Sequence, residues 1–393
     1  MKGYIKRNTE NQIETYLSDF PAVAILGPRQ CGKTTLAKRI GLNNQNAIHI
    51  DLEKQSDLRK LQDPELFFQA NRESLVCLDE IQRIPDLFPT LRSVIDDRNR
   101  NSQFLILGSA SRDLLRQSSE SLAGRIAYIE LTPFSFVELK DAEEVTPIQQ
   151  EDLWMRGGFP RSVLAATNNA SIVWRQNFVR TFLERDIPQL GFQIPAASIS
   201  RLWQMLAHQQ GQLLNGSRIG KSLGVSHTTV RSYLELLSQT FMIRLLPPLL
   251  PNLKKRLVKS PKIYVRDSGV LHSLLEIDSY NGLLGHPVYG NSWEGFALEN
   301  ILSVYSDWNA NFYRTSAGAE LDLVLSRGNR RIAIEFKAST TPHLTKGFWN
   351  ALEDLSIEKA WIVALVDSAY PIRENVMVTP LDQFLKLGPK DVQ

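Results

Sequence analysis

The first 131 residues alternate between short apolar runs and segments in which apolar positions recur at helical spacing. The apolar runs predict buried strands at 22–26, 47–51, 75–78, 104–107 and 126–131. The segments between them predict helices at 35–40, 64–71 and 88–97. Strands that alternate with helices indicate an α/β fold with a parallel sheet, which binds ligands at the carboxyl ends of its strands.

The first predicted strand leads directly into a loop of the pattern G-x-x-x-x-G-K-[ST]. The loop comprises Gly27, Pro28, Arg29, Gln30, Cys31, Gly32, Lys33 and Thr34, and Thr35 continues into the next helix. Glycines let the main chain curl so that its N–H groups point at phosphate oxygens, and the helix N-terminus adds positive charge. We expect Lys33 to reach the β- and γ-phosphates of ATP and the Thr34 hydroxyl to bind Mg²⁺. The alternative is a glycine-rich turn without a ligand.

Four polar residues beside the later strands are candidates for the hydrolysis chemistry. Asp79 and Glu80 follow the run 75–78, so we expect Asp79 in the Mg²⁺ shell and Glu80 beside the attacking water, unless the pair is purely structural. Ser109 follows the run 104–107 and is either a sensor of the γ-phosphate or a helix N-cap. Arg125 is either an arginine finger, acting in cis or on a partner subunit, or half of a surface ion pair.

The middle of the chain predicts a helical connector at 141–195, which we interpret as a lid beside the nucleotide, followed by a winged helix at 196–262. Gly224-Val225-Ser226 predicts the turn before a second helix that buries Val230, Tyr233, Leu234 and Leu237, with a wing at 241–246. Outward-facing and basic residues are the candidate DNA contacts. These residues are His227, Thr228, Arg231, Lys254, Lys255 and Arg256, with Lys259 and Lys262 as further phosphate neutralisers. The alternatives are a protein-binding module and a solvated basic linker.

The C-terminal segment, 263–393, contains two alternating runs at 320–325 and 331–337, joined by the turn signal Gly328-Asn329. Counting from that turn places Asp322 opposite Glu335 and Glu320 opposite Lys337, all on one face. This pattern resembles the restriction-endonuclease superfamily. The resemblance implies that Asp322 and Glu335 hold Mg²⁺, that Lys337 orients water, and that Glu294 or Glu299 on the preceding helix completes the shell. The alternative is a salt-bridge network on a solvated sheet face.

Composition narrows the setting. The chain has 393 residues, which predicts two or three domains, and its net charge of +3 requires any nucleic-acid surface to be local. The only cysteines are Cys31 and Cys77, which suggests neither a disulfide nor a zinc site and favours a reducing cytoplasm. We find no signal peptide and no run long enough to cross a bilayer, so no membrane partner is expected.

Several motifs taken together resemble a widespread bacterial and archaeal family. They are the loop 27–34, Asp79-Glu80, Gly108-Ser109, Gly124-Arg125, Pro133-Phe134-Ser135-Phe136 and Gly157-Gly158-Phe159-Pro160. Members join an AAA-superfamily ATPase to a C-terminal domain of unknown function with a winged helix and a nuclease-like fold. The resemblance implies an ATPase domain at 1–140, which uses ATP and Mg²⁺.

The leading hypothesis is therefore an ATP-hydrolysing AAA-type protein that binds duplex or branched DNA through its C-terminal half and remodels or processes it. A second hypothesis is a nucleotide-dependent switch whose winged helix binds protein. A third is an ATP-gated, Mg²⁺-dependent nuclease. A homo-oligomer follows only if Arg125 acts on a partner subunit.

Overall fold

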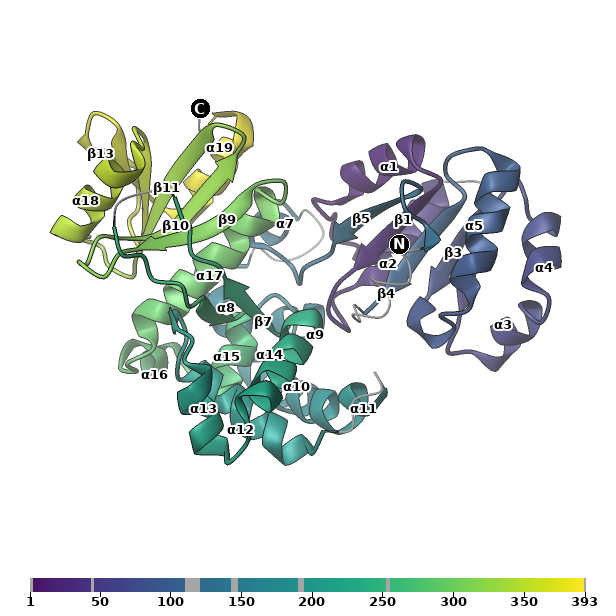
Figure 1. Cartoon of the computed structure of the whole chain (residues 1–393), viewed down its shortest axis with the longest axis horizontal. Helices are drawn as coiled ribbons and strands as arrows, with labels where there is room; N and C mark the ends of the chain where they lie inside the picture. The colour runs from purple at the N-terminus through teal and green to yellow at the C-terminus, as the bar shows by residue number, and fades with distance from the viewer. Residues whose placement is uncertain are drawn as a thin grey trace. The chain divides into compact units, whose positions relative to one another are not determined.

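The computed structural model describes residues 3–43, 46–109, 121–142, 148–189, 194–251 and 255–391 (Figure 1). It consists of two compact units. One comprises Met1–Phe134, Ala142–Thr146 and Gln239–Phe241, and the other comprises Ser135–Asp141, Pro147–Ser238 and Met242–Gln393. Across the described part of the chain, no helix combines the length and the apolar character needed to cross a bilayer.

The first unit contains a five-stranded parallel sheet in the order β2-β3-β4-β1-β5. Its strands are β1 (Ala22–Leu26), β2 (Ala47–Asp51), β3 (Leu75–Asp79), β4 (Phe104–Gly108) and β5 (Ile126–Glu130). All five predicted strands and the parallel α/β architecture are confirmed. Because every strand runs the same way, their carboxyl ends share one edge of the sheet.

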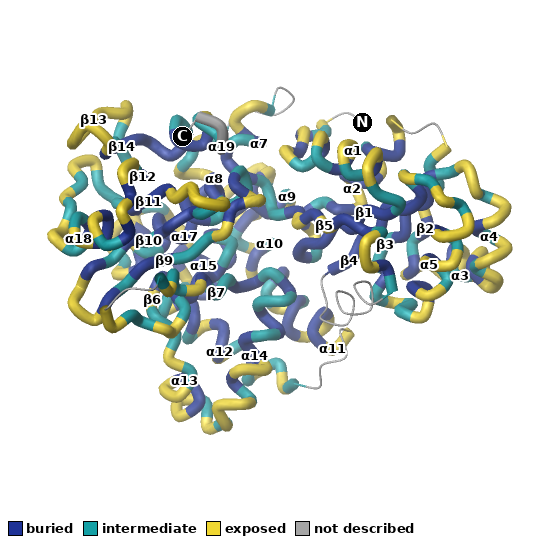
Figure 2. Tube along the Cα trace, turned by 45° about the horizontal axis from the view of Figure 1, so that its top comes forward, coloured by how far each residue is buried: buried dark blue, intermediate teal, exposed yellow. Residues whose placement is uncertain are grey.

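Helices cover both faces of this sheet. One face packs against α1 (Glu10–Asp19) and α2 (Lys33–Asn43), and the other packs against α5 (Leu87–Arg98). Figure 2 shows β1, β3 and β4 as buried and the outer helices as partly exposed. The smaller helices are α3 (Gln55–Lys60), α4 (Pro64–Ala70) and the 3₁₀ turn η1 (Ile81–Arg83). Helix α2 runs past Gly41, whereas the pattern predicted that it would end at residue 40. A Cβ atom at position 41 would lie 2.7 Å from the His49 imidazole, which explains the glycine there.

The second unit begins with α7 (Phe136–Lys140) and continues through a mostly helical region. This region contains α8 (Gln150–Arg156), α9 (Pro160–Val163), α10 (Asn168–Thr181), the π-helical turn η2 (Phe182–Asp186), α11 (Ile187–Gln189), α12 (Ala196–Ala207) and α15 (Ser268–Leu274). The Gly157-Gly158 turn packs against Asp267, which accepts a hydrogen bond from the Gly158 N–H at 2.8 Å. A side chain at Gly157 would lie 2.1 Å from that carboxylate, which explains the glycine.

A small three-stranded sheet follows α12 in the order β6-β8-β7. Its elements along the chain are β6 (Gln212–Leu213), α13 (Gly216–Leu223), α14 (His227–Gln239), β7 (Ile243–Leu246) and β8 (Lys262–Val265). The predicted turn and helix are present: Gly224 is left-handed with φ 69°, and Ser226 caps α14 by accepting the Thr229 N–H at 3.0 Å. The side chains predicted to be buried on α14 are buried.

A six-stranded mixed sheet forms the C-terminal part, in the order β13-β14-β12-β11-β10-β9. Its strands are β9 (Asn309–Arg314), β10 (Glu320–Arg327), β11 (Arg330–Lys337), β12 (Ala360–Ala364), β13 (Tyr370–Arg373) and β14 (Val376–Thr379). Helix α18 (Lys346–Leu355) packs on one face, while α17 (Tyr289–Val304) and α19 (Leu381–Asp391) contact each other, β11 and β12. The short helix α16 (Tyr280–Leu284) precedes α17.

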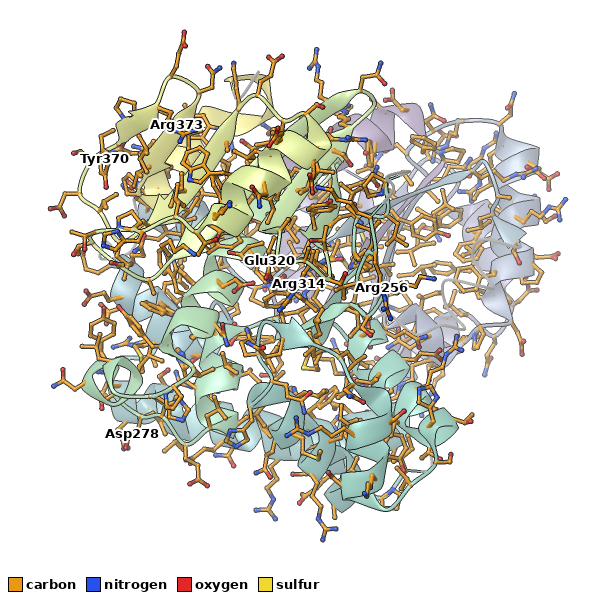
Figure 3. The ribbon with its side chains drawn as sticks, turned by 60° about the vertical axis from the view of Figure 1, so that its left-hand side comes forward. Arg256, Asp278, Arg314, Glu320, Tyr370 and Arg373 are labelled. Carbon is orange, nitrogen blue, oxygen red and sulfur yellow. The ribbon has the colours of Figure 1, made fainter. Side chains whose placement is uncertain are left out.

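The edge strand β9 is covered by the segment between β7 and β8. The Leu249 N–H donates to Phe312 O at 2.7 Å, and the Val258 N–H donates to Arg314 O at 3.0 Å. Arg256, Arg314 and Glu320 mark this edge in Figure 3. The segment that carries the candidate DNA contacts of the basic run, with a solvated linker as the alternative, is therefore partly a strand-like cover for an otherwise open sheet edge.

Candidate nucleotide site

The phosphate-binding loop lies between β1 and α2, at the carboxyl edge of the parallel sheet. Gly32 has φ 105° and Gln30 has φ 65°, so the main chain curls as the motif requires. A Cβ atom at Gly27 would lie 2.2 Å from Leu131 O, where β5 ends beside the loop. The loop therefore has no room for a side chain at its first position.

Lys33 is buried, with 5% of its surface exposed, at the start of α2. Its ammonium donates hydrogen bonds to Gly27 O at 3.0 Å and to Pro28 O at 2.9 Å. Both acceptors belong to the loop itself, so the positive charge is held beside the place where the loop would enclose a phosphate.

Thr34 and Asp79 form the candidate magnesium site. The Thr34 hydroxyl donates to Asp79 Oδ2 at 2.6 Å. Asp79 Oδ1 is buried and has no hydrogen-bond partner in the described part of the chain. Burial raises the pKa of Asp79, and the Thr34 hydrogen bond and the Lys33 charge offset this only in part. A hydroxyl beside an unsatisfied carboxylate oxygen suits Mg²⁺, which is usually held by one or two protein ligands together with substrate phosphates.

Glu80 and Ser109 are linked by Gln82, a residue that the sequence reasoning missed. The Gln82 amide donates to the Glu80 carboxylate and also to Ser109 Oγ, the latter at 3.0 Å. Glu80 itself is left-handed, with φ 59°. The two predicted catalytic residues thus belong to one hydrogen-bonded group at adjacent strand ends. The residues that would test the N-cap alternative for Ser109, beginning at 110, lie outside the described ranges.

Arg7 is a second residue that the sequence reasoning missed. Its side chain is buried, and its guanidinium donates to Cys31 O in the loop at 3.0 Å and to Thr132 O beyond β5 at 2.6 Å. The same group lies 4.6 Å from the centre of the Phe134 ring. Arg7 therefore ties the phosphate loop to the segment that follows the last strand. It stands before the first apolar run and follows no motif, so no local signal marked it.

Arg125 does not reach the phosphate loop. It precedes β5, and its carbonyl accepts the Ala22 N–H at the amino end of β1, whereas the loop follows the carboxyl end of β1. Its guanidinium forms a two-pronged ion pair with Asp96, at 2.6 and 3.0 Å. This placement is at odds with a finger acting in cis and fits the ion-pair alternative. A role on a partner subunit stays a prediction.

The predicted DNA contacts fall into two groups. His227, Thr228 and Arg231 are exposed on α14, as expected, and Arg231 pairs with Glu235 at 3.0 Å. The basic run behaves differently, because Lys255 pairs with Asp354 and the Arg256 carbonyl accepts the Ser316 N–H at 2.9 Å. Lys254 lies outside the described residues. The main chain of this run is engaged along the β9 edge, whereas the Lys255 and Arg256 side chains are exposed, so their role as DNA contacts stays a prediction.

The predicted register of β10 on β11 is confirmed for the pairs from Arg327–Arg330 to Leu323–Ile334. The shift between Leu321 and Val324 lies in the pairing of β10 with β9, which the turn does not determine. The predicted nuclease-like cluster differs from expectation in its charge, and Asp322 Oδ2 accepts the Phe336 N–H at 3.2 Å. Lys337 forms a salt bridge with Glu335 at 2.8 Å. The alternative of a salt-bridge network expected such an ion pair for Lys337, but with a different carboxylate.

These residues do not fit a divalent metal. Lys262, predicted to neutralise phosphate, is buried and places its ammonium 2.9 Å from Asp322. Within the described ranges, no group of three or more His, Cys, Asp or Glu side chains is arranged to hold a metal ion. Burial, followed by the charge of Asp322, raises the pKa of Glu335 to about 8 and that of Glu294 to about 7.

Glu299, the competitor of Glu294, lies elsewhere. Burial alone would raise its pKa, but Arg244 and Arg266 lower it to about 2. Arg244 Nη2 and Arg266 Nε each lie 2.9 Å from Glu299 Oε2. Of the two candidate helix acids, only Glu294 contacts the cluster.

The parallel sheet and its phosphate loop define an AAA-type ATPase domain, and residues 19–140 match the family model described as an AAA domain. Residues 148–281 and 289–384 match two models described as domains of unknown function, DUF8612 and DUF4143. The chain belongs to the same family as Uncharacterized protein Rv2008c of Mycobacterium tuberculosis, with 40% identity over 386 residues, covering 98% of this chain and 86% of that protein. Uncharacterized protein Mb2031c of Mycobacterium bovis matches equally well.

Among solved structures, the chain is similar to the Walker-type ATPase PABY2304 of Pyrococcus abyssi. The identity is 17% and the TM-score is 0.49, and the match covers 69% of this chain and 96% of the other.

Proposed function

We propose that this protein binds ATP with Mg²⁺ at the carboxyl edge of the five-stranded sheet and hydrolyses it. The observation that carries the proposal is the Thr34–Asp79 contact of 2.6 Å beside a buried, unpartnered carboxylate oxygen. With Lys33 held in the loop, these groups form a binding site for a metal-bound triphosphate.

The residues of this site have distinct roles in the proposal. The loop N–H groups and Lys33 bind the phosphates, and Thr34 and Asp79 orient the cation, which neutralises charge on the leaving phosphates when it is bound. Glu80 accepts the proton of the attacking water or polarises it. Gln82 holds Glu80 and Ser109 in one hydrogen-bonded group, so that Ser109 can transmit the presence of the γ-phosphate to the base.

The decisive experiment replaces the proposed base. Glu80→Gln should bind ATP with unchanged affinity and lose turnover by about 100-fold, the lower end of the effect of a positioned general base. A fluorescent ATP analogue measures binding, and phosphate release measures turnover. The control is Glu65→Gln, an exposed carboxylate on α4. Full turnover in Glu80→Gln would reject the assigned base, and loss of binding would reassign Glu80 to the binding site.

We further propose that α13 and α14 together present a DNA-binding surface. The element order α12-β6-α13-α14-β7-β8 and the sheet order β6-β8-β7 support our interpretation of this segment as a winged helix, in which the second helix of the pair would read a groove. Arg218, Lys221, His227 and Arg231 are exposed on α13 and α14, which favours an anionic partner.

The DNA proposal is tested by the double change Arg218→Glu and Lys221→Glu. Duplex affinity and its salt dependence should both fall, because each lost phosphate contact reduces the salt slope by about 1. Unchanged binding would favour the alternative of a nucleotide-dependent switch whose winged helix binds protein. ATP turnover with and without duplex or forked DNA separates the two further, since only the DNA hypothesis expects stimulation. Magnesium-dependent DNA cleavage is not proposed, because Lys262 occupies the acidic cluster.

A further inference from the structure

Lys262 begins β8 and carries its ammonium into an acidic cluster formed by other elements. Its side chain is 4% exposed. The Nζ atom lies 2.9 Å from Asp322 Oδ1, 3.2 Å from Glu294 Oε1 and 3.2 Å from Glu320 Oε1. Two of these carboxylates come from β10 and one from α17, so a single ammonium joins three elements.

This ammonium contacts Asp322 and Glu294, for which the resemblance to the restriction-endonuclease superfamily implied a bound Mg²⁺. Three carboxylates from a helix and a strand, converging on one point, are the ligand set expected of Mg²⁺ or Mn²⁺. A lysine offers three N–H donors and one positive charge, and here each of the three carboxylates lies within 3.2 Å of it. A divalent ion at the same centre would meet a buried like charge at contact distance.

Most of the other polar atoms of the cluster have partners within the protein, although Glu335 Oε2 is buried without a hydrogen-bond partner in the described part of the chain. The Tyr264 hydroxyl donates to Glu294, and Arg314 lies 3.4 Å from Glu320. Asp322 also accepts the Phe336 N–H, and Lys337 pairs with Glu335. A buried ion is retained only where partners of this kind compensate for its lost hydration. The Lys262 ammonium and its three carboxylate partners meet that condition through groups of the protein itself.

We propose that the Lys262 ammonium is the resident cation of this cluster, which therefore takes no divalent metal in the intact chain and instead fastens β8 to β10 and α17. The consequence concerns a part of the chain separate from the nucleotide site. The C-terminal sheet has the acidic residues of a metal centre, but it uses them as an internal ionic joint. Removal of the ammonium converts the joint into a site for a divalent cation.

The test is a Mn²⁺ titration of the full-length chain without nucleotide. The concentration of free Mn²⁺ is measured at each step by electron paramagnetic resonance. Every protein carries Asp79→Asn, so that the nucleotide site does not contribute. With Lys262 intact, we expect no binding tighter than about 1 mM, the weak end of protein cation sites. Lys262→Met should gain a single site, tighter by about 100-fold because the opposing charge is gone. Adding Asp322→Asn to that variant should abolish the gain.

Two further measurements keep the proposal open to refutation. Mn²⁺ should raise the melting temperature of Lys262→Met and leave that of the Lys262 protein unchanged. If Lys262→Met does not fold, the comparison of Asp322→Asn with its parent, both with Lys262 intact, still decides: equal, negligible Mn²⁺ binding supports the proposal. A single Mn²⁺ site in the parent that Asp322→Asn removes would overturn it. So would a folded Lys262→Met protein that gains no site, or DNA cleavage that depends on Asp322.

Discussion

Arg7 gives the sharpest test of how the nucleotide site is held together. Replacing it with alanine removes the donors that Cys31 O and Thr132 O use at 3.0 and 2.6 Å. Hydrogen bonds to a charged group contribute about 1.5–3 kcal/mol each. The contact with the Phe134 ring at 4.6 Å adds about 1 kcal/mol. Together these contributions predict that Arg7→Ala weakens the local structure of the loop by about 4 kcal/mol.

The effect should be local, because Arg7 contacts the loop rather than the sheet core. Hydrogen exchange of peptides covering 20–40 measures the free energy of local opening, and it suits a chain of two units better than one global unfolding curve. ATP affinity should fall in parallel, because the curled loop must re-form before it can bind phosphate. Arg7→Lys keeps the charge but not the forked geometry and should fall in between.

Arg72→Ala is the matched control. Its side chain pairs with the neighbouring Glu73, and both side chains are largely exposed. The reasoning would be refuted if Arg7→Ala matched Arg72→Ala in exchange protection and bound ATP within about twofold of the unchanged protein, since a loss of 4 kcal/mol corresponds to almost 1,000-fold.

Three further predictions address other parts of the structure. Gly27→Ala should abolish ATP binding because its Cβ meets Leu131 O at 2.2 Å, whereas Gly41→Ala, which meets the side chains of His49 and Ala47 rather than main chain, should retain binding in the same fluorescence assay. Arg125→Ala should keep turnover within about twofold at low protein concentration, since an exposed ion pair contributes little; a loss that depends on protein concentration would instead assign Arg125 to a partner's site. Burial lowers the pKa of His272 to about 3, so stability should be full above the unfolded value of about 6.5 and decline as the pH falls toward 3. Unfolding midpoints of His272→Gln should decline less over that range, and an identical slope would contradict the assignment.

The parallel sheet was predictable because its information is local. The central strands β1, β3 and β4 are apolar runs buried on both faces, and the edge strands β2 and β5 are partly exposed. The phosphate loop is a contiguous motif whose geometry follows from two glycines. The hairpin register at Arg327 and Arg330 was predictable for the same reason, because a two-residue turn determines the adjacent pairs. The predicted pairs hold as far as Leu323 and Ile334, and the shift near Asp322 concerns the pairing of β10 with β9, which the turn does not determine.

The long-range polar contacts were not predictable. Arg7 reaches Cys31 and Thr132 across 24 and 125 residues, and no pattern in the sequence marks such a contact. Lys262 lies near a basic run in the sequence and was therefore expected to face phosphate. It is buried instead, because β8 pairs with β6 and β7 on its two sides. Charge composition cannot separate a displayed lysine from a buried one, because the difference depends on which elements pack around it.

The cover over β9 has a practical consequence for anyone who divides this chain into pieces. A fragment that starts at 289 would keep β9 but lose the main-chain partners at 247–249 and 256–258, as well as the ammonium that balances its carboxylates. Such a fragment would have an unpaired edge strand, which favours aggregation, and a cluster of carboxylates that repel one another. Recombinant fragments of the C-terminal sheet should therefore begin upstream of residue 247, so that they retain the segment that covers β9.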